Sequence, residues 1–198
     1  ATPDLYSDAV FHDGVRRWSL GQLWLEDNDS AHFEEEIAAH PFEDDFWDAV
    51  QTSDRFGEVQ VAGYHLGGWM DVFQRGTVDA FLGYQNEGGE GARGNQKLIM
   101  GPWTHNSPWS SEHGELVFPE NAAYPTHADL FDVMFNAWLG LDHPDISDRP
   151  EDRPAVQYYV MGDVDDPDAP GNSWRTAEDW PPPAAGVRLY LQPDGSLV

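Results

Sequence analysis

An aspartate and a histidine stand shortly after two predicted strands. Asp71 lies in the segment GGWMDVF, and His105 ends the segment GPWTH. A carboxylate held against an imidazole fixes the tautomer of the ring and stabilises the imidazolium that forms when histidine removes a proton. The two residues therefore predict an acid–base dyad in which Asp71 orients His105 and His105 transfers the proton.

Each of these residues also has a plainer interpretation. A single aspartate after a strand is usually a turn or cap residue, and a single histidine usually lies at the surface or packs in the core. Spacing alone does not choose between a dyad and two unrelated residues. The decision depends on whether the surrounding elements bring Asp71 and His105 together.

The surrounding sequence predicts a strand–helix–strand unit. Residues 59–66 (VQVAGYHL) are typical of a strand, and residues 97–100 (KLIM) are typical of a second. The intervening helical stretch has apolar residues on or near one face, namely Val72, Phe73, Val78, Phe81 and Leu82. Strands joined by such a crossover normally pair in parallel, and open α/β sheets bind ligands at the carboxyl ends of their strands. We therefore expect Asp71 and His105 at the same edge of one sheet.

Outside this unit the sequence predicts helical regions before and after it, and strands only toward the C-terminal end of the sequence. Residues 5–56 have a helical, aromatic and acidic pattern without a strand, and an amphipathic helix is predicted over residues 126–139. After a polar linker, residues 156–161 (VQYYVM) and 187–191 (VRLYL) are typical of strands in a separate β-rich unit.

The segments GGWMDVF and GPWTH resemble the paired motifs of the cocaine-esterase-like family of α/β-hydrolases, which includes X-prolyl dipeptidyl peptidases. In that family the Asp of Gly-Trp-x-Asp and the His of Gly-Pro-Trp-x-His complete a serine triad, and these positions match Asp71 and His105. Asp before His is also the chain order of the acid and base in α/β-hydrolases. Residues 40–47 resemble the end of the family's helical cap, and residues 160–162 and 189–191 resemble parts of its C-terminal jelly roll.

The resemblance implies an α/β fold with three parts. These are a helical cap region at residues 1–56, the C-terminal part of an α/β-hydrolase domain at residues 57–145, and a linker with the start of a jelly-roll β-sandwich at residues 146–198. The implied activity is that of a serine hydrolase that cleaves an ester, an amide or a short X-Pro peptide. No cofactor is implied, and the sequence does not choose among these substrates.

The sequence departs from the family in one respect that matters for catalysis. The family's nucleophile is a serine on a sharp turn, in a pattern such as Gly-x-Ser-x-x-Gly, and no serine here has that setting. We therefore expect a C-terminal-half fragment that supplies only Asp71 and His105, has no nucleophile of its own and is inactive alone. The alternative is a non-catalytic fragment or binding module with a hydrolase-like fold.

Other candidate sites have weaker support. Eight histidines occur without a His-x-x-x-His or His-Glu-x-x-His spacing, so we expect no metal site. His65 either lines a pocket or is a hydrogen-bonded core residue, and Trp69 and Trp103 either pack beneath the dyad or border the substrate. The acidic run at residues 43–45 either recognises a substrate amine or forms a solvated surface.

The charge of the chain restricts its partners. It contains 36 Asp and Glu against 10 Lys and Arg, a formal net charge of -26, and Lys97 is its one lysine. Such a field repels nucleic acids and anionic membranes, and no apolar run is long enough to span a bilayer. We interpret the acidic surface as an adaptation to high salt, with an ordinary acidic protein as the alternative. A cytoplasmic location in a high-salt organism is favoured, and secretion stays open because the true N-terminus is expected to lie upstream.

Overall fold

A computed structural model describes residues 11–12, 15–16, 36, 39–42, 44–105, 108–124, 150–166, 168–186, 188–193 and 195–196. The chain divides into two compact units, Ala1–Asp54 and Arg55–Val198. The predicted helix at residues 126–139 lies outside the described residues.

The first unit contains short elements. Strands β1 (Phe11–His12) and β2 (Val15–Arg16) pair antiparallel, although the sequence pattern predicted no strand in this region. Helix α4 (Asp45–Asp48) begins after Asp44, whose side chain accepts the backbone N–H of Phe46 at 3.0 Å and thereby caps the helix. The larger helical cap predicted over residues 1–56 stays a prediction.

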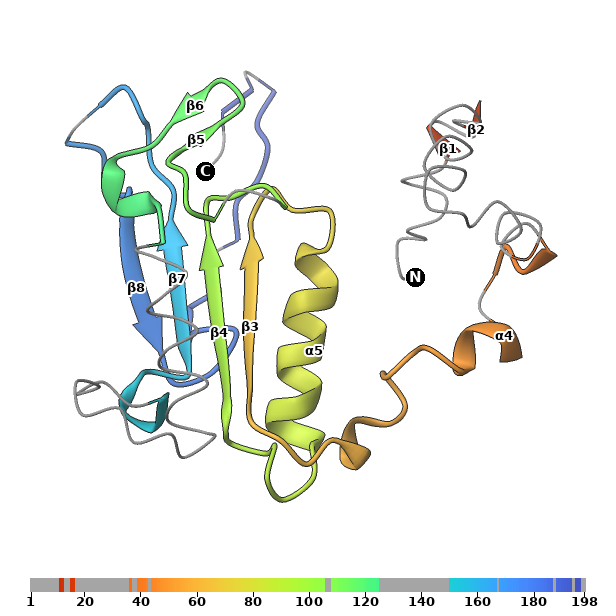
Figure 1. Cartoon of the computed structure of the whole chain (residues 1–198). Coiled ribbons are helices and arrows are strands. Elements are labelled where there is room, and N and C mark those ends of the chain that lie inside the picture. The colour runs from red at the N-terminus through yellow and green to blue at the C-terminus, as the bar shows by residue number, and fades with distance from the viewer. Residues whose placement is uncertain are drawn as a thin grey trace. The chain divides into compact units, whose positions relative to one another are not determined.

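The second unit is built on a four-stranded mixed sheet (Figure 1). In chain order its elements are β3 (Gly63–Gly68), α5 (Gln74–Glu87), β4 (Gln96–Gly101), β7 (Val156–Val160) and β8 (Ser173–Ala177). The spatial order is β3-β4-β7-β8, with β3, β4 and β7 parallel and β8 antiparallel to β7. Three carboxyl ends therefore meet at one edge of the sheet, where Figure 1 shows the arrowheads together.

Alternating side chains of β4 build the core on both faces of the sheet. Leu98 and Met100 are fully buried and pack with Phe81 of α5. Ile99 points to the other face, where it packs with Trp103 and Tyr124. This alternation is the period of two that a strand imposes, and it explains why an almost continuous apolar run forms a strand buried on both faces.

Short elements surround the sheet. The 3-10 helices are η1 (Phe56–Glu58), η2 (Glu120–Ala122) and η4 (Pro150–Asp152). Strands β5 (Glu112–His113) and β6 (Leu116–Val117) form a small hairpin whose turn contains Gly114 at a φ of +64°. A positive φ suits glycine, which has no Cβ to clash.

The predicted βαβ unit is confirmed, with shifts in its boundaries. Strand β3 starts at Gly63, four residues later than predicted, and continues through Gly67 and Gly68, beyond the predicted end at residue 66. Both glycines pair with β4, opposite Met100 and Gly101. Val72 was predicted on the helix face, but it precedes α5 and is 72% exposed.

The prediction for the C-terminal strands was partly wrong. Strand β7 forms close to the predicted position, but it pairs with β4 and belongs to the same sheet rather than to a separate β-rich unit. Strand β8 was not predicted. Residues 188–191 form no strand beyond one bridging residue, Leu191, and the side chains of Leu189 and Leu191 are mostly exposed. The jelly roll over residues 146–198 stays a prediction.

Candidate active site

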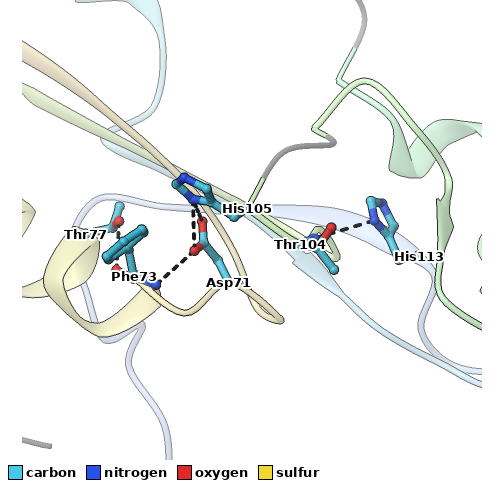
Figure 2. Close-up of polar contacts among 6 residues, drawn as sticks. All are labelled: Asp71, Phe73, Thr77, Thr104, His105 and His113. Carbon is cyan, nitrogen blue, oxygen red and sulfur yellow. Dashed lines mark hydrogen bonds and ion pairs between the residues drawn. The ribbon is translucent and has the colours of Figure 1, made fainter. Parts of the chain in front are cut away.

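Asp71 and His105 lie on two neighbouring loops at the carboxyl edge of the sheet. Strands β3 and β4 are parallel neighbours, and their last residues, Gly68 and Gly101, are register partners. The loops that follow therefore leave the sheet side by side. His105 Nδ1 lies 3.2 Å from each carboxylate oxygen of Asp71 (Figure 2). The predicted proximity of the two side chains is thus observed, while their catalytic role stays a prediction.

Backbone hydrogen bonds tie the two loops together. The Trp69 N–H donates to Gly101 O at 2.9 Å, and the Met70 N–H donates to Trp103 O at 3.1 Å. The approach is so close that a Cβ built on Gly68 would lie 2.0 Å from Trp103 O. The pairing of the strands is thereby continued into the loops, up to one residue before Asp71.

Asp71 combines a turn role with its contact to His105. Its Oδ1 accepts the backbone N–H of Phe73 at 2.8 Å, and its carbonyl accepts the N–H of Gln74, the first residue of α5. The plainer interpretation of Asp71 as a turn residue is therefore confirmed, and the same carboxylate also contacts His105. The Asp71 side chain is 8% exposed, whereas that of His105 is 52% exposed.

The second ring nitrogen of His105, Nε2, is not used by the contact with Asp71. With Nδ1 directed at Asp71, none of the described residues forms a hydrogen bond with Nε2. An imidazole held at Nδ1 by a carboxylate can accept a proton at Nε2.

Phe73 is a site residue that sequence reasoning missed. It was predicted as part of the apolar helix face, but its ring lies edge-on to the His105 ring, with centroids 4.9 Å apart (Figure 2). It precedes α5 and is 44% exposed. The available signal was its position two residues after Asp71, where an Asx turn directs the chain back toward the carboxylate.

Trp69 and Trp103 pack beneath the loops. Trp103 is 1% exposed, and its indole N–H donates to Ala122 O at 2.7 Å. The indole N–H of Trp69 donates to Tyr159 O at 2.7 Å, which links the β3 loop to β7. Of the two predicted roles, packing is the one that these contacts support.

His65 is a core residue rather than part of the candidate site. Its Nε2 lies 3.0 Å from the side-chain oxygen of Gln96, and its ring contacts Phe81 and Tyr84 of α5. Burial lowers the pKa of His65, and the hydrogen bond to Gln96 opposes that shift.

In the acidic run at residues 43–45, the structure shows a structural role for Asp44. Asp44 caps α4 and hydrogen-bonds to His40 at 2.7 Å, a contact that lowers the pKa of Asp44. Asp45 is exposed, and Glu43 lies outside the described residues. Within the described ranges, no three His, Asp or Glu side chains are grouped as metal ligands, and no helix is long and apolar enough to cross a membrane.

Comparison with known proteins extends the likeness beyond the two motifs. The sequence profile of the X-Pro dipeptidyl-peptidase (S15) family matches residues 4–107, just over half of the chain and a range that includes Asp71 and His105. The cocaine esterase of Rhodococcus sp. strain MB1 Bresler is 24% identical over 163 residues, which are 82% of this chain and 25% of the esterase. The chain thus spans about a quarter of this relative.

Two solved structures have a similar fold. An aminopeptidase from a marine sediment archaeon, Thaumarchaeota archaeon, superposes with a TM-score of 0.58 at 25% identity over 100% of this chain and 30% of its own. A CocE/NonD family hydrolase from Staphylococcus aureus gives a TM-score of 0.58 at 18% identity over 96% of this chain and 31% of its own. These likenesses confirm the predicted partial α/β-hydrolase fold.

Proposed function

Because the chain belongs to the X-Pro dipeptidyl-peptidase (S15) family, we propose that it supplies the acid and the base of a serine hydrolase. In this proposal Asp71 is the acid, His105 is the base, and the nucleophilic serine comes from a part of the protein other than these 198 residues. The reaction is transfer of an acyl group to water, from an ester or an amide.

The observation that carries the proposal is the contact between His105 Nδ1 and the Asp71 carboxylate. Both oxygens lie 3.2 Å from Nδ1, and the contact is made at the carboxyl ends of two adjacent parallel strands. The Phe73 N–H also donates to Asp71, so the orientation of the carboxylate does not depend on the imidazole alone. A buried carboxylate that holds one ring nitrogen is what a general base needs in order to present the other.

The proposed steps follow from these positions. The serine hydroxyl attacks the substrate carbonyl while His105 Nε2 takes its proton, and Asp71 stabilises the imidazolium that forms. His105 then gives that proton to the leaving alkoxide or amine, which leaves an acyl-enzyme. Water attacks the acyl-enzyme with His105 again as the base, and the proton returns to the serine. No described residue is assigned to the oxyanion hole.

The proposed substrates include several classes. One relative is an esterase and one structural neighbour is an aminopeptidase, so we propose esters, amides and short peptides, including X-Pro peptides, as candidate substrates. A panel of 4-nitrophenyl esters and X-Pro 4-nitroanilides, assayed with the full-length protein, separates these classes by their relative kcat/KM.

The proposal is tested by His105→Ala in the full-length protein. We expect hydrolysis of a responsive ester to fall by about a thousandfold or more, and labelling by a fluorophosphonate, which reacts with activated serines, to be lost. Because His105 is half exposed, the variant should keep the melting temperature of the wild type. A folded wild-type protein that neither hydrolyses the panel nor takes up the probe would instead favour the non-catalytic binding module.

A further inference from the structure

A second histidine lies next to the loop that carries His105. His113 of β5 is 4% exposed, and both of its ring nitrogens have partners. Nε2 lies 2.9 Å from Ser110 O, and Nδ1 lies 3.5 Å from the backbone N of Thr104, the residue before His105 (Figure 2). The sequence pattern indicated no role for His113.

The two partners define one form of the His113 ring. A backbone carbonyl only accepts hydrogen bonds, so the nitrogen that faces Ser110 O has to carry the proton. A backbone N–H only donates, so the nitrogen that faces Thr104 has to be unprotonated. The contacts thus select a neutral imidazole in the Nε2–H tautomer.

Contacts other than the one with Thr104 hold the His113 ring in its orientation. The Ser110 side chain closes the preceding turn by accepting the Glu112 N–H at 2.9 Å. His113 then pairs with Leu116 in the β5–β6 hairpin, and its ring lies 6.4 Å from that of Phe118. A ring held in this way offers Nδ1 as a fixed acceptor.

A hydrogen bond to Thr104 affects the position of His105, because the two residues are adjacent in the chain. The preceding residue, Trp103, is anchored by its carbonyl to Met70 and by its indole to Ala122. The N–H of Thr104 extends this anchoring to the residue adjacent to His105. At 3.5 Å the bond is long and adds little stability, but even small displacements of a reacting group are costly in rate.

We infer that His113 is a positioning residue for His105: its neutral imidazole accepts the Thr104 N–H and so sets the place of the base relative to the nucleophile. This inference rests on the proposed function, in which His105 transfers the proton. It assigns to the β5–β6 hairpin a role in the geometry of the reaction, although His113 does not touch the reacting atoms.

Two amide substitutions separate the two bonds of His113. In His113→Asn the side-chain oxygen occupies about the place of Nδ1, so the acceptor for Thr104 is kept and the bond to Ser110 is lost. In His113→Gln the side-chain nitrogen occupies about the place of Nε2, so the bond to Ser110 is kept and the acceptor is lost. His65→Gln is the matched control, because it alters a partly buried histidine whose contacts lie between the sheet and α5.

The experiment measures kcat, KM and melting temperature for these variants in the full-length protein. We expect His113→Gln to lower kcat by about ten- to a hundredfold with little change in KM, and His113→Asn to restore most of that loss. His65→Gln should lower the melting temperature and keep kcat. Equal kcat values for the Asn and Gln variants, or a loss that follows melting temperature alone, would overturn the inference.

A second measurement does not depend on activity. Spectra of ¹⁵N-labelled imidazole groups should show His113 as the Nε2–H tautomer near pH 8, and a Nδ1–H tautomer would contradict the assignment. The outcomes also distinguish the two proposals. If His105→Ala is inactive and His113→Gln is normal, only the positioning role fails. If His105→Ala is fully active, the proposed function fails first.

Discussion

At the scale of single residues, the site depends on one carboxylate with two partners. Asp71 accepts the N–H of Phe73 through Oδ1 and faces His105 through both oxygens. The contact with Phe73 orients the carboxylate independently of His105. The role of Asp71 as a turn residue therefore supports its proposed catalytic role. The same double use explains why spacing alone did not decide between the two interpretations.

Asp71→Asn tests the charge of this carboxylate with little change in shape. The amide oxygen can still accept the Phe73 N–H, but a neutral amide neither stabilises an imidazolium nor selects the right tautomer. We expect kcat of the full-length protein to fall by about a hundredfold or more while the melting temperature changes little. Asp79→Asn removes the same charge from the exposed face of α5 and should leave kcat unchanged. Similar activities for the two variants would remove Asp71 from the mechanism.

His65 makes stability depend on pH in a direction that its burial determines. Its pKa is lowered in the folded protein, so the unfolded chain binds a proton more readily. The contribution of neutral His65 is fully present above its unfolded pKa, about 6.5, and is lost as pH falls through the lower folded value.

We expect the free energy of unfolding of the wild type to fall more steeply from about pH 7.5 to about pH 5 than that of His65→Gln, which cannot titrate. Urea unfolding of both proteins at several pH values measures this difference and cancels the effect of the many shared carboxylates. Parallel stability curves would show that burial of His65 does not restrict its protonation.

At the scale of elements, the site depends on how closely the ends of β3 and β4 approach. Gly68 pairs with Gly101, and the backbone N–H groups of the next two residues donate to Gly101 O and Trp103 O. A side chain at position 68 would meet the backbone of Trp103 rather than a mobile group. The glycine is therefore needed for the loop that carries His105 as much as for its own strand.

Gly68→Ala should separate the two loops. With 2.0 Å between a new Cβ and Trp103 O, we expect a loss of stability of about 2 kcal/mol or more together with a fall in kcat. Gly76→Ala is the matched control, because nothing lies within 4 Å of a Cβ there and alanine favours the helix by up to about 1 kcal/mol. Chemical unfolding of both variants tests this contrast. A harmless Gly68→Ala would mean that the loops can part without cost.

The elements also show what the sequence made predictable. The buried run of β4 and the apolar face of α5 gave the βαβ unit, and the chain order placed Asp71 and His105 at one edge. Strand β8 was missed because residues 173–177 (SWRTA) have no fully buried member and pair with β7 at the edge of the sheet. The place of β7 was missed because pairing with β4, about 60 residues earlier in the sequence, leaves no local pattern. The contacts of Phe73 and His113 arise from loop geometry, which periodicity does not report.

At the scale of the whole molecule, two features stand apart from the site: the free end of the strand order at β3 and the acidic surface. Among the described strands, β3 pairs with β4 alone and so forms one edge of the sheet. An edge strand can in general pair with a further strand, and the proposed function places further strands of this sheet in other parts of the protein. The charge is instead a property of the surface, and the hydrolase assignment does not depend on it.

The acidic surface predicts a dependence of stability on salt. A formal charge of -26 with one lysine stores repulsion between carboxylates in the folded state, and the Debye length falls from about 10 Å at 0.1 M to about 3 Å at 1 M salt. We expect the melting temperature of the full-length protein to rise from about 0.1 to about 3 M KCl, and activity to recover with it. Thermal melts across that series are the measurement, with a second series in an uncharged osmolyte to separate screening from solvent exclusion. An acidic protein adapted to low salt would give a nearly flat series in KCl, because its surface would tolerate the repulsion at 0.1 M. A rise in KCl that the osmolyte does not reproduce would assign the effect to the charges and support the high-salt interpretation.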